Sequence, residues 1–152
     1  MYKRILVPID GSPTSERALQ EAIMLAAGNT PAAKAQLRLI YVIEEPYPLD
    51  AESYVFINYA TLQEAMRQTG ERILALAAKT VQLAGLTAET AVLEAHGERT
   101  AHVIDGDAQR WKADVIVIGT HGRSGVGRML LGSVAENVVR GASVPVLLVR
   151  AG

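Results

Sequence analysis

The chain has no cysteine and only one tryptophan and one phenylalanine among its 152 residues. Without cysteine there are no disulfides, no thiolate catalysis and no cysteine-ligated metal, and a reducing compartment suits such a chain, so we expect a cytoplasmic protein. No apolar run approaches the length of a membrane span, and the short run at residues 5–9 ends at Asp10, unlike the core of a signal peptide. We therefore expect no association with a membrane.

The sequence also lacks a surplus of charge, with a formal net charge of −1. Such a chain has no general basic field for nucleic acid, so nucleic acid is not an expected partner. Hydrophobic residues make up 49% of the chain, which suits one domain with a full core and leaves little room for a second. We expect residues 1–152 to form a single domain.

Short β-branched runs alternate with longer segments of helical periodicity. The predicted strands span residues 4–9, 37–43, 87–95, 114–119 and 145–149. The predicted helices span residues 13–27, 56–84, 98–112 and 133–140. This order predicts an α/β fold: a doubly wound, five-stranded parallel sheet with helices on both faces.

The composition of the strands predicts how each is covered. Residues 4–9, 114–119 and 145–149 are almost wholly apolar, as expected for strands covered on both faces. Residues 87–95 include polar side chains, so this strand is expected at an edge of the sheet. The first helix is expected to begin with Ser12 as its N-cap, followed by proline at the first helical position.

The most informative segment, residues 119–133, holds five glycines directly after an apolar strand. Glycine lacks Cβ and tolerates positive φ, so such a loop can aim several backbone N–H groups at an anion. Ser133 and Glu136 have the spacing of a capping box that opens a helix, whose positive dipole end also attracts anions. Residues 115–135 contain no acidic residue but do contain Arg123. The segment therefore predicts a phosphate site. The simpler alternative is that the glycines only form turns and Ser133 only caps its helix. Ser133 can also do both, capping the helix and binding phosphate.

The order of the elements places this site at one end of the sheet. Ligands of doubly wound sheets bind beyond the carboxyl ends of the strands where the winding reverses, here between residues 4–9 and 114–119, which sets Asp10 opposite Gly119. The Asp10 carboxylate is a candidate for bonding a ribose hydroxyl or acting on metal or water, and an Asx turn is an equal alternative. Pro8 removes a ladder donor, which indicates an irregular strand end with a carbonyl exposed near the ligand.

Other motifs fail on spacing. Residues 122–127 are not followed by the lysine and Ser/Thr of a Walker loop, and Leu130 stands where the dinucleotide fingerprint needs its third glycine. A hydrolase elbow around Ser124 would need glycine at Val126. The histidines are too scattered to predict a metal site, and only His121, in the glycine-rich segment, is a candidate for phosphate contact.

The pattern Gly119-x-x-Gly122-x9-Gly132-Ser133, together with residues 5–12 and 143–149, resembles the ATP-binding branch of the universal stress protein family. The resemblance covers the whole chain. It implies a flavodoxin-like sheet of strand order 3-2-1-4-5 and a homodimer formed through the last strand, from Val144 to Val149.

The resemblance also implies a site for ATP with a divalent cation, Mg or Mn. Pro8, Ile9 and Asp10 would flank adenosine, with the aspartate on the ribose; the backbone of Val42 would read the adenine edge, and Gly119 would approach the ribose. The triphosphate would be held by Gly122, Arg123, Gly132, Ser133 and Val134, with the cation bridging its oxygens. Ala135 lacks the hydroxyl that some members carry at that position.

Three functions fit these observations. The first is an ATP-binding regulatory protein of stress adaptation, in which nucleotide occupancy changes the shape or the choice of an unidentified protein partner. The second is a slow ATPase or phosphotransfer enzyme using Asp10 or His121, and the third is an interaction module that binds no nucleotide. The missing Walker residues, and the absence of an evident base to activate water, favour the first over the second.

Overall fold

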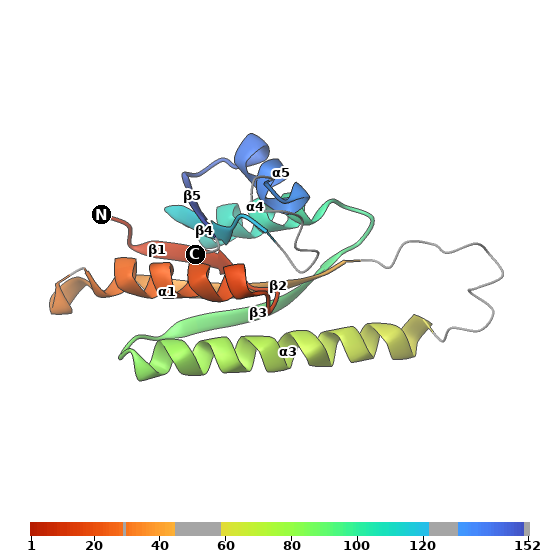
Figure 1. Ribbon diagram of the computed structural model, residues 1–152, viewed down its shortest axis with the longest axis horizontal. Coiled ribbons are helices and arrows are strands. Elements are labelled where there is room, and N and C mark those ends of the chain that lie inside the picture. The colour runs from red at the N-terminus through yellow and green to blue at the C-terminus, as the bar shows by residue number, and fades with distance from the viewer. Residues whose placement is uncertain (29, 45–58, 122–130, 151–152) are drawn as a thin grey trace.

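The structure is a computed structural model that describes residues 1–28, 30–44, 59–121 and 131–150, in which a parallel sheet lies between two layers of helices (Figure 1). In chain order the elements are β1 (Arg4–Pro8), α1 (Pro13–Ala27), a 3-10 turn η1 (Pro31–Ala33), β2 (Gln36–Glu44), α3 (Tyr59–Leu83), β3 (Ala88–Ala95), α4 (Thr100–Trp111), β4 (Val115–Gly119), α5 (Ser133–Gly141) and β5 (Val146–Val149). The predicted alternation of strands and helices is confirmed, and α1 has the predicted bounds. Gly122 and Arg123 lie outside the described residues.

The strands are parallel and lie in the order β3-β2-β1-β4-β5, which confirms the predicted doubly wound fold and the edge position of β3. β1 pairs with β2 along its whole length, as far as Pro8 opposite Ile40. Against β4, however, β1 is paired only at Ile5 and Leu6. The two central strands therefore part at their carboxyl ends, where the direction of winding reverses.

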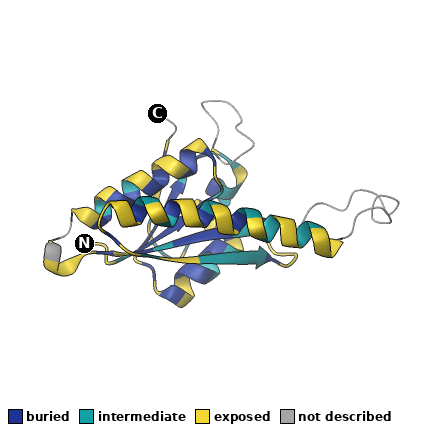
Figure 2. Cartoon of the chain, turned by 90° about the horizontal axis from the view of Figure 1, so that it is seen from below, coloured by how far each residue is buried: buried dark blue, intermediate teal, exposed yellow. Residues whose placement is uncertain are grey.

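Each face of the sheet has its own core. α1 and α3 cover one face, over the side chains of Ile5, Val7 and Leu39, and α4 and α5 cover the other, over Leu6 and Ile116 (Figure 1). In Figure 2 the central strands are dark blue and the outward surfaces of the helices are yellow, so the apolar strand runs pack as their composition predicts. No helix in the four described ranges is both long and apolar enough to cross a bilayer.

The expectation that residues 145–149 form a strand covered on both faces is wrong. β5 is the second edge of the sheet, and Leu147 and Leu148 are 38% and 37% exposed. An apolar run shows that a strand avoids water, but it does not show whether helices of the same chain or another surface provide the cover.

The two helix starts next to β1 and β4 differ. Ser12 caps α1 as predicted: its Oγ accepts a hydrogen bond of 3.2 Å from the N–H of Ser15, and Pro13 is the first helical residue. The predicted capping box of α5 is wrong. The N-cap is Gly132, Ser133 is already helical, and the carboxylate of Glu136 bonds Arg140 at 2.8 Å. The helix itself begins at Ser133, the first residue of the predicted range, and the Gly132 carbonyl accepts its first helical bond, from the Glu136 N–H at 2.9 Å.

A buried ion pair joins β2 to α4. The Arg38 guanidinium bonds both carboxylate oxygens of Asp107, Nε to Oδ2 at 2.7 Å and Nη2 to Oδ1 at 2.9 Å, and the side chain of Asp107 is only 4% exposed. The hydrogen bonds from Arg38 to Asp107 raise the pKa of the guanidinium above its ordinary value. This pair ties α4 to the centre of the sheet, below the end at which the candidate site lies.

Candidate functional site

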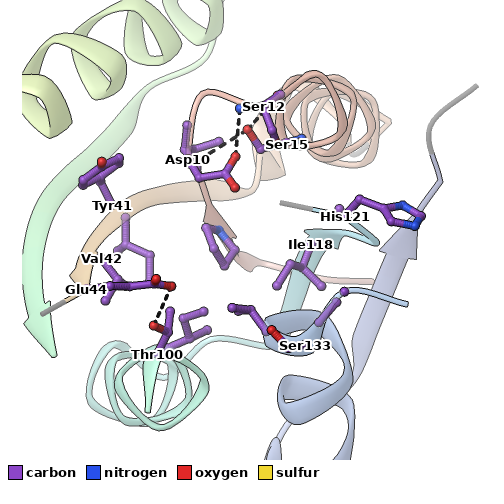
Figure 3. A pocket seen from close by; sticks show the side chains of 18 of the residues that line it. Asp10, Ser12, Ser15, Tyr41, Val42, Glu44, Thr100, Ile118, His121 and Ser133 are labelled. Carbon is purple, nitrogen blue, oxygen red and sulfur yellow. Dashed lines mark hydrogen bonds between the residues drawn. The ribbon is translucent and has the colours of Figure 1, made fainter. Parts of the chain in front are cut away.

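A cavity of about 500 Å³ opens where β1 and β4 part, at the carboxyl ends of the central strands (Figure 3). Eight of the ten sequence-predicted site residues are described, and all eight line this cavity: Pro8, Ile9, Asp10, Val42, Gly119, Gly132, Ser133 and Val134. Segments far apart in the sequence therefore meet at one place.

Pro8 lies at the point where the two strands separate. The N–H of Ile9 donates to the carbonyl of Ile40 at 2.8 Å, so the backbone groups of Ile9 face β2. Because alternate backbone groups of a strand point to opposite neighbours, those of Pro8 face the side of β4, beyond the last β1–β4 pair at Leu6. Pro8 therefore removes no hydrogen bond from the sheet. Its carbonyl faces the gap between β1 and β4, as predicted from the sequence.

Asp10 follows β1 and forms the Asx turn that was one of its two interpretations. Its Oδ1 accepts a hydrogen bond of 2.8 Å from the N–H of Ser12, and its own N–H donates to the Oγ of Ser15 at 3.4 Å (Figure 3). The same residue lines the cavity. The turn therefore fixes the carboxylate in place without withdrawing it from the site.

Three helices direct their N-termini toward the cavity, and two of these ends already have a carboxylate beside them. At α1 it is Asp10, and at α4 it is Glu44, whose Oε1 accepts a hydrogen bond of 3.0 Å from the hydroxyl of Thr100. At α5 the N-cap is Gly132, none of the described side chains caps the helix, and Glu136 is not among the residues that line the cavity. Since uncapped helical N–H groups and the helix dipole attract anions, the start of α5 is the favoured place for negative charge.

Gly119 ends β4 with its Cα against the first turn of α1. A Cβ built on it would lie 2.9 Å from the backbone of Thr14, so no larger residue fits without a shift. The hydroxyl of Thr14 donates to the backbone carbonyl of His121, and Gly132 donates its N–H to the carbonyl of Thr120 at 2.6 Å. These bonds fix both ends of the segment that was predicted to bind phosphate.

His121 contributes to this wall, but its ring does not face the centre of the cavity. In Figure 3 the imidazole points toward β5, away from Asp10 and Ser133. Its Nδ1 lies 3.0 Å from the hydroxyl of Thr120. In this arrangement the ring is not directed at the start of α5.

Sequence reasoning missed several lining residues, among them Glu44, Met66, Thr100 and Ile104. Glu44 ends β2 and Thr100 begins α4, so the rule that sites form beyond strand ends could have identified both. Met66 lies within the long helix α3, where periodicity predicts which face is buried but not how far the helix reaches along the sheet. Among the described residues, no three histidine or carboxylate side chains gather closely enough to hold a metal ion.

The profile of the Universal stress protein family matches residues 1–150. Universal stress protein MJ0531 of Methanocaldococcus jannaschii is 36% identical over 152 residues, which cover 99% of this chain and 83% of that protein. Among solved structures, hypothetical protein MJ0577 superposes with a TM-score of 0.82 at 27% identity, covering 100% of this chain and 98% of the other.

A universal stress protein solved in complex with cAMP superposes with a TM-score of 0.63 at 28% identity, covering 97% of this chain and 96% of the other. That protein thus binds a nucleotide on the same fold. The profile match and the identity to MJ0531 both extend over nearly the whole chain. This chain belongs to the universal stress protein family.

Proposed function

We propose that this protein binds ATP with a divalent cation, Mg or Mn, in the cavity between β1 and β4, and that it is a regulatory protein of stress adaptation whose occupancy by nucleotide changes its shape or partner. The observation that carries the proposal is the start of α5, a helix end that no described side chain caps and that faces a cavity of nucleotide size. The cAMP complex of a family member supports an adenine nucleotide as the ligand.

The phosphates would lie at Gly132, Ser133 and Val134, next to the first backbone N–H groups of α5. Gly122 and Arg123, from the segment that joins β4 to α5, would complete this contact, and both lie outside the described residues. The cation would be held mainly by phosphate oxygens, because Mg²⁺ in nucleotide sites takes few protein ligands and keeps several waters.

The sugar and the base would follow along the cavity toward β2. Asp10, held by its Asx turn, would accept hydrogen bonds from the ribose hydroxyls, between the walls made by Pro8 and Gly119. The backbone of Val42 faces the same side of β2 as the carbonyl of Ile40, which bonds Ile9, and β1 has ended at this level. Its N–H and carbonyl would therefore pair with the polar edge of adenine.

Calorimetry with ATP and magnesium tests this assignment. Gly132 has the extended conformation (φ −61°, ψ 153°) that any residue adopts, so Gly132→Val should fold while its side chain blocks the phosphates. We expect binding by the wild type and none by this variant. Gly141→Val, at the other end of α5 with nothing within 4 Å of its added Cβ, is the matched control and should bind normally. Normal binding by Gly132→Val would refute the phosphate site.

We further propose that β5 forms a homodimer through residues 144–149. The strand is an open edge, and the exposed apolar side chains of Leu147 and Leu148 lie on it, with Val139 of α5 46% exposed. Unpaired apolar edges promote uncontrolled association, and a two-fold contact with a second copy closes them. The dimer would place two nucleotide sites on one particle.

A further inference from the structure

We infer that Glu44, oriented by Thr100, reads the exocyclic amino group of the bound base and makes the cavity selective for adenine over oxo-purines. The inference rests on the proposed function, since it assigns a specificity-determining residue to the same site. Glu44 is the last residue of β2, and Thr100 is the first of α4. Both line the cavity, on the side opposite His121 in Figure 3.

The position of Glu44 follows from the order of a nucleotide. With phosphates at Ser133 and ribose at Asp10, the base would lie beyond the ribose, at the side of the cavity lined by β2 and the start of α4. This end has apolar walls from Ile40, Val42 and Ile104, suited to the faces of a purine. The side chains of Val42 and Glu44 point to the same face of the sheet because they are two residues apart on one strand. A purine whose polar edge pairs with the backbone of Val42 would thus have its exocyclic amino group beside the carboxylate of Glu44.

The chemistry of a carboxylate limits which edge it accepts. An ionised carboxylate only accepts hydrogen bonds, so it attracts the amino group of adenine and repels the carbonyl oxygen that hypoxanthine and guanine carry at the same position. Among the described residues that line the cavity, Asp10 is the other carboxylate, and it belongs to the ribose end. Glu44 is therefore the charged side chain that faces the base.

Thr100 favours adenine over a guanine that binds in a second orientation, with its N–H donors directed at Glu44. Guanine could present two adjacent N–H donors to both oxygens of a carboxylate, an arrangement that needs both oxygens to be directed at the base. The Thr100 hydroxyl donates to Oε1 at 3.0 Å, which directs that oxygen toward α4 and leaves Oε2 for the base. A single acceptor matches the one amino group of adenine.

The test compares the affinities of ATP, ITP and GTP, each with magnesium, for the wild type and three variants. We expect the wild type to bind ATP at least about tenfold more tightly than ITP or GTP, the discrimination that one unmatched charged hydrogen bond gives. Glu44→Gln can donate to a carbonyl oxygen, so the ATP-to-ITP ratio should fall by about tenfold. Thr100→Val frees Oε1, so binding of GTP should improve relative to ATP.

Glu98→Gln is the matched control, because it removes the same charge from an exposed position near the start of α4 that does not line the cavity, and it should keep the wild-type ratios. Circular dichroism verifies that each variant is folded. An unchanged ATP-to-ITP ratio in Glu44→Gln, with ATP still bound, would overturn the role of Glu44 and leave the proposed function intact. Tighter binding of GTP than ATP by the wild type would overturn the selectivity, and no binding of ATP at all would overturn both.

Discussion

The hydroxyl of Thr14, in the first turn of α1, donates a hydrogen bond to the backbone carbonyl of His121, two residues beyond the end of β4. The contact joins the helix that follows β1 to the chain that leads into the glycine-rich segment. It depends on Gly119, whose missing Cβ lets the backbone of Thr14 approach. The wall of the cavity is thus held by packing as well as by hydrogen bonds.

Replacement of Gly119 by alanine should lower the free energy of unfolding by about 1–3 kcal/mol, because the new Cβ would lie 2.9 Å from backbone atoms of Thr14. Urea denaturation measures the change. Gly141→Ala, whose added Cβ meets nothing within 4 Å, is the control and should be nearly neutral. Equal stability of Gly119→Ala and the wild type would show that α1 can move away from β4 without loss.

Replacement of Ser133 by alanine should leave the stability of the free protein within about 0.5 kcal/mol, because this exposed serine does not cap α5. Its affinity for ATP should fall by about tenfold through loss of a hydrogen bond to phosphate. Ser12→Ala provides the contrast, since Ser12 does cap α1 and its loss should cost about 1 kcal/mol of stability. Urea titrations and calorimetry on both variants separate capping from binding, and a Ser133→Ala variant as destabilised as Ser12→Ala would contradict the structure of the α5 start.

ATP should be hydrolysed slowly or not at all. The imidazole of His121 points toward β5, and the Oδ1 of Asp10 accepts a bond from Ser12, so neither is placed as a free base for an attacking water. Phosphate release under saturating ATP and magnesium should be far below one per second and equal in the wild type and His121→Ala. Turnover of about one per second that collapses in His121→Ala would show that the protein is an enzyme.

The proposed dimer should dissociate when a charge is placed on the β5 edge. We expect sedimentation equilibrium to give a dimer for the wild type at micromolar concentration and a monomer for Leu148→Arg, since a buried unpaired charge opposes association. Leu76→Arg is the control, because Leu76 is 70% exposed on α3, away from β5, and its replacement should leave the dimer intact. A wild-type protein that is monomeric at this concentration would refute the proposed dimer.

Asp105 should make stability depend on pH. Burial opposes its ionisation, but hydrogen bonds from the N–H and hydroxyl of Ser143, together with one from Gln109, outweigh burial and lower the pKa of this carboxyl below its ordinary 3.8. A lowered pKa in the folded state means that the contribution is present above pH 3.8 and is lost as the pH falls through the folded-state pKa. Asp105→Ala should therefore be about 1 kcal/mol less stable than the wild type at neutral pH, with the difference disappearing in acid. A difference that is constant down to pH 2 would contradict the assignment.

The layered fold could be predicted because the composition of each strand by itself indicates whether the strand is buried. Apolar runs such as residues 115–118 must be covered on both faces, and the alternation with helices leaves a parallel sheet as the solution. The same rule placed Asp10 and Gly119 at one cavity. The expectation of cover on both faces failed for β5. A strand covered by another surface and a strand covered by the chain's own helices need the same apolar side chains, so composition does not distinguish them.

The details of the site depend on contacts between distant residues, which spacing does not specify. The Ser133–Glu136 pattern fits a capping box, yet the N-cap is Gly132, whose N–H donates to the carbonyl of Thr120 and whose carbonyl accepts from the Glu136 N–H. The hydrogen bond between Glu44 and Thr100 joins residues 56 positions apart, and no local pattern indicates it. Both are consequences of how α4 and α5 are docked on the sheet.

The early end of the β1–β4 pairing has a consequence for how a nucleotide signal could travel. A nucleotide bound as proposed would lie between these strands without breaking a backbone bond, so the sheet would be pre-organised for it and would need little movement on binding. A nucleotide bound as proposed would act on the start of α5, and α5 packs beside β5, an edge strand of the sheet. Information about occupancy would thus run through the C-terminal third of the chain toward its neighbour, while the half of the sheet formed by β2 and β3 acts as a fixed frame.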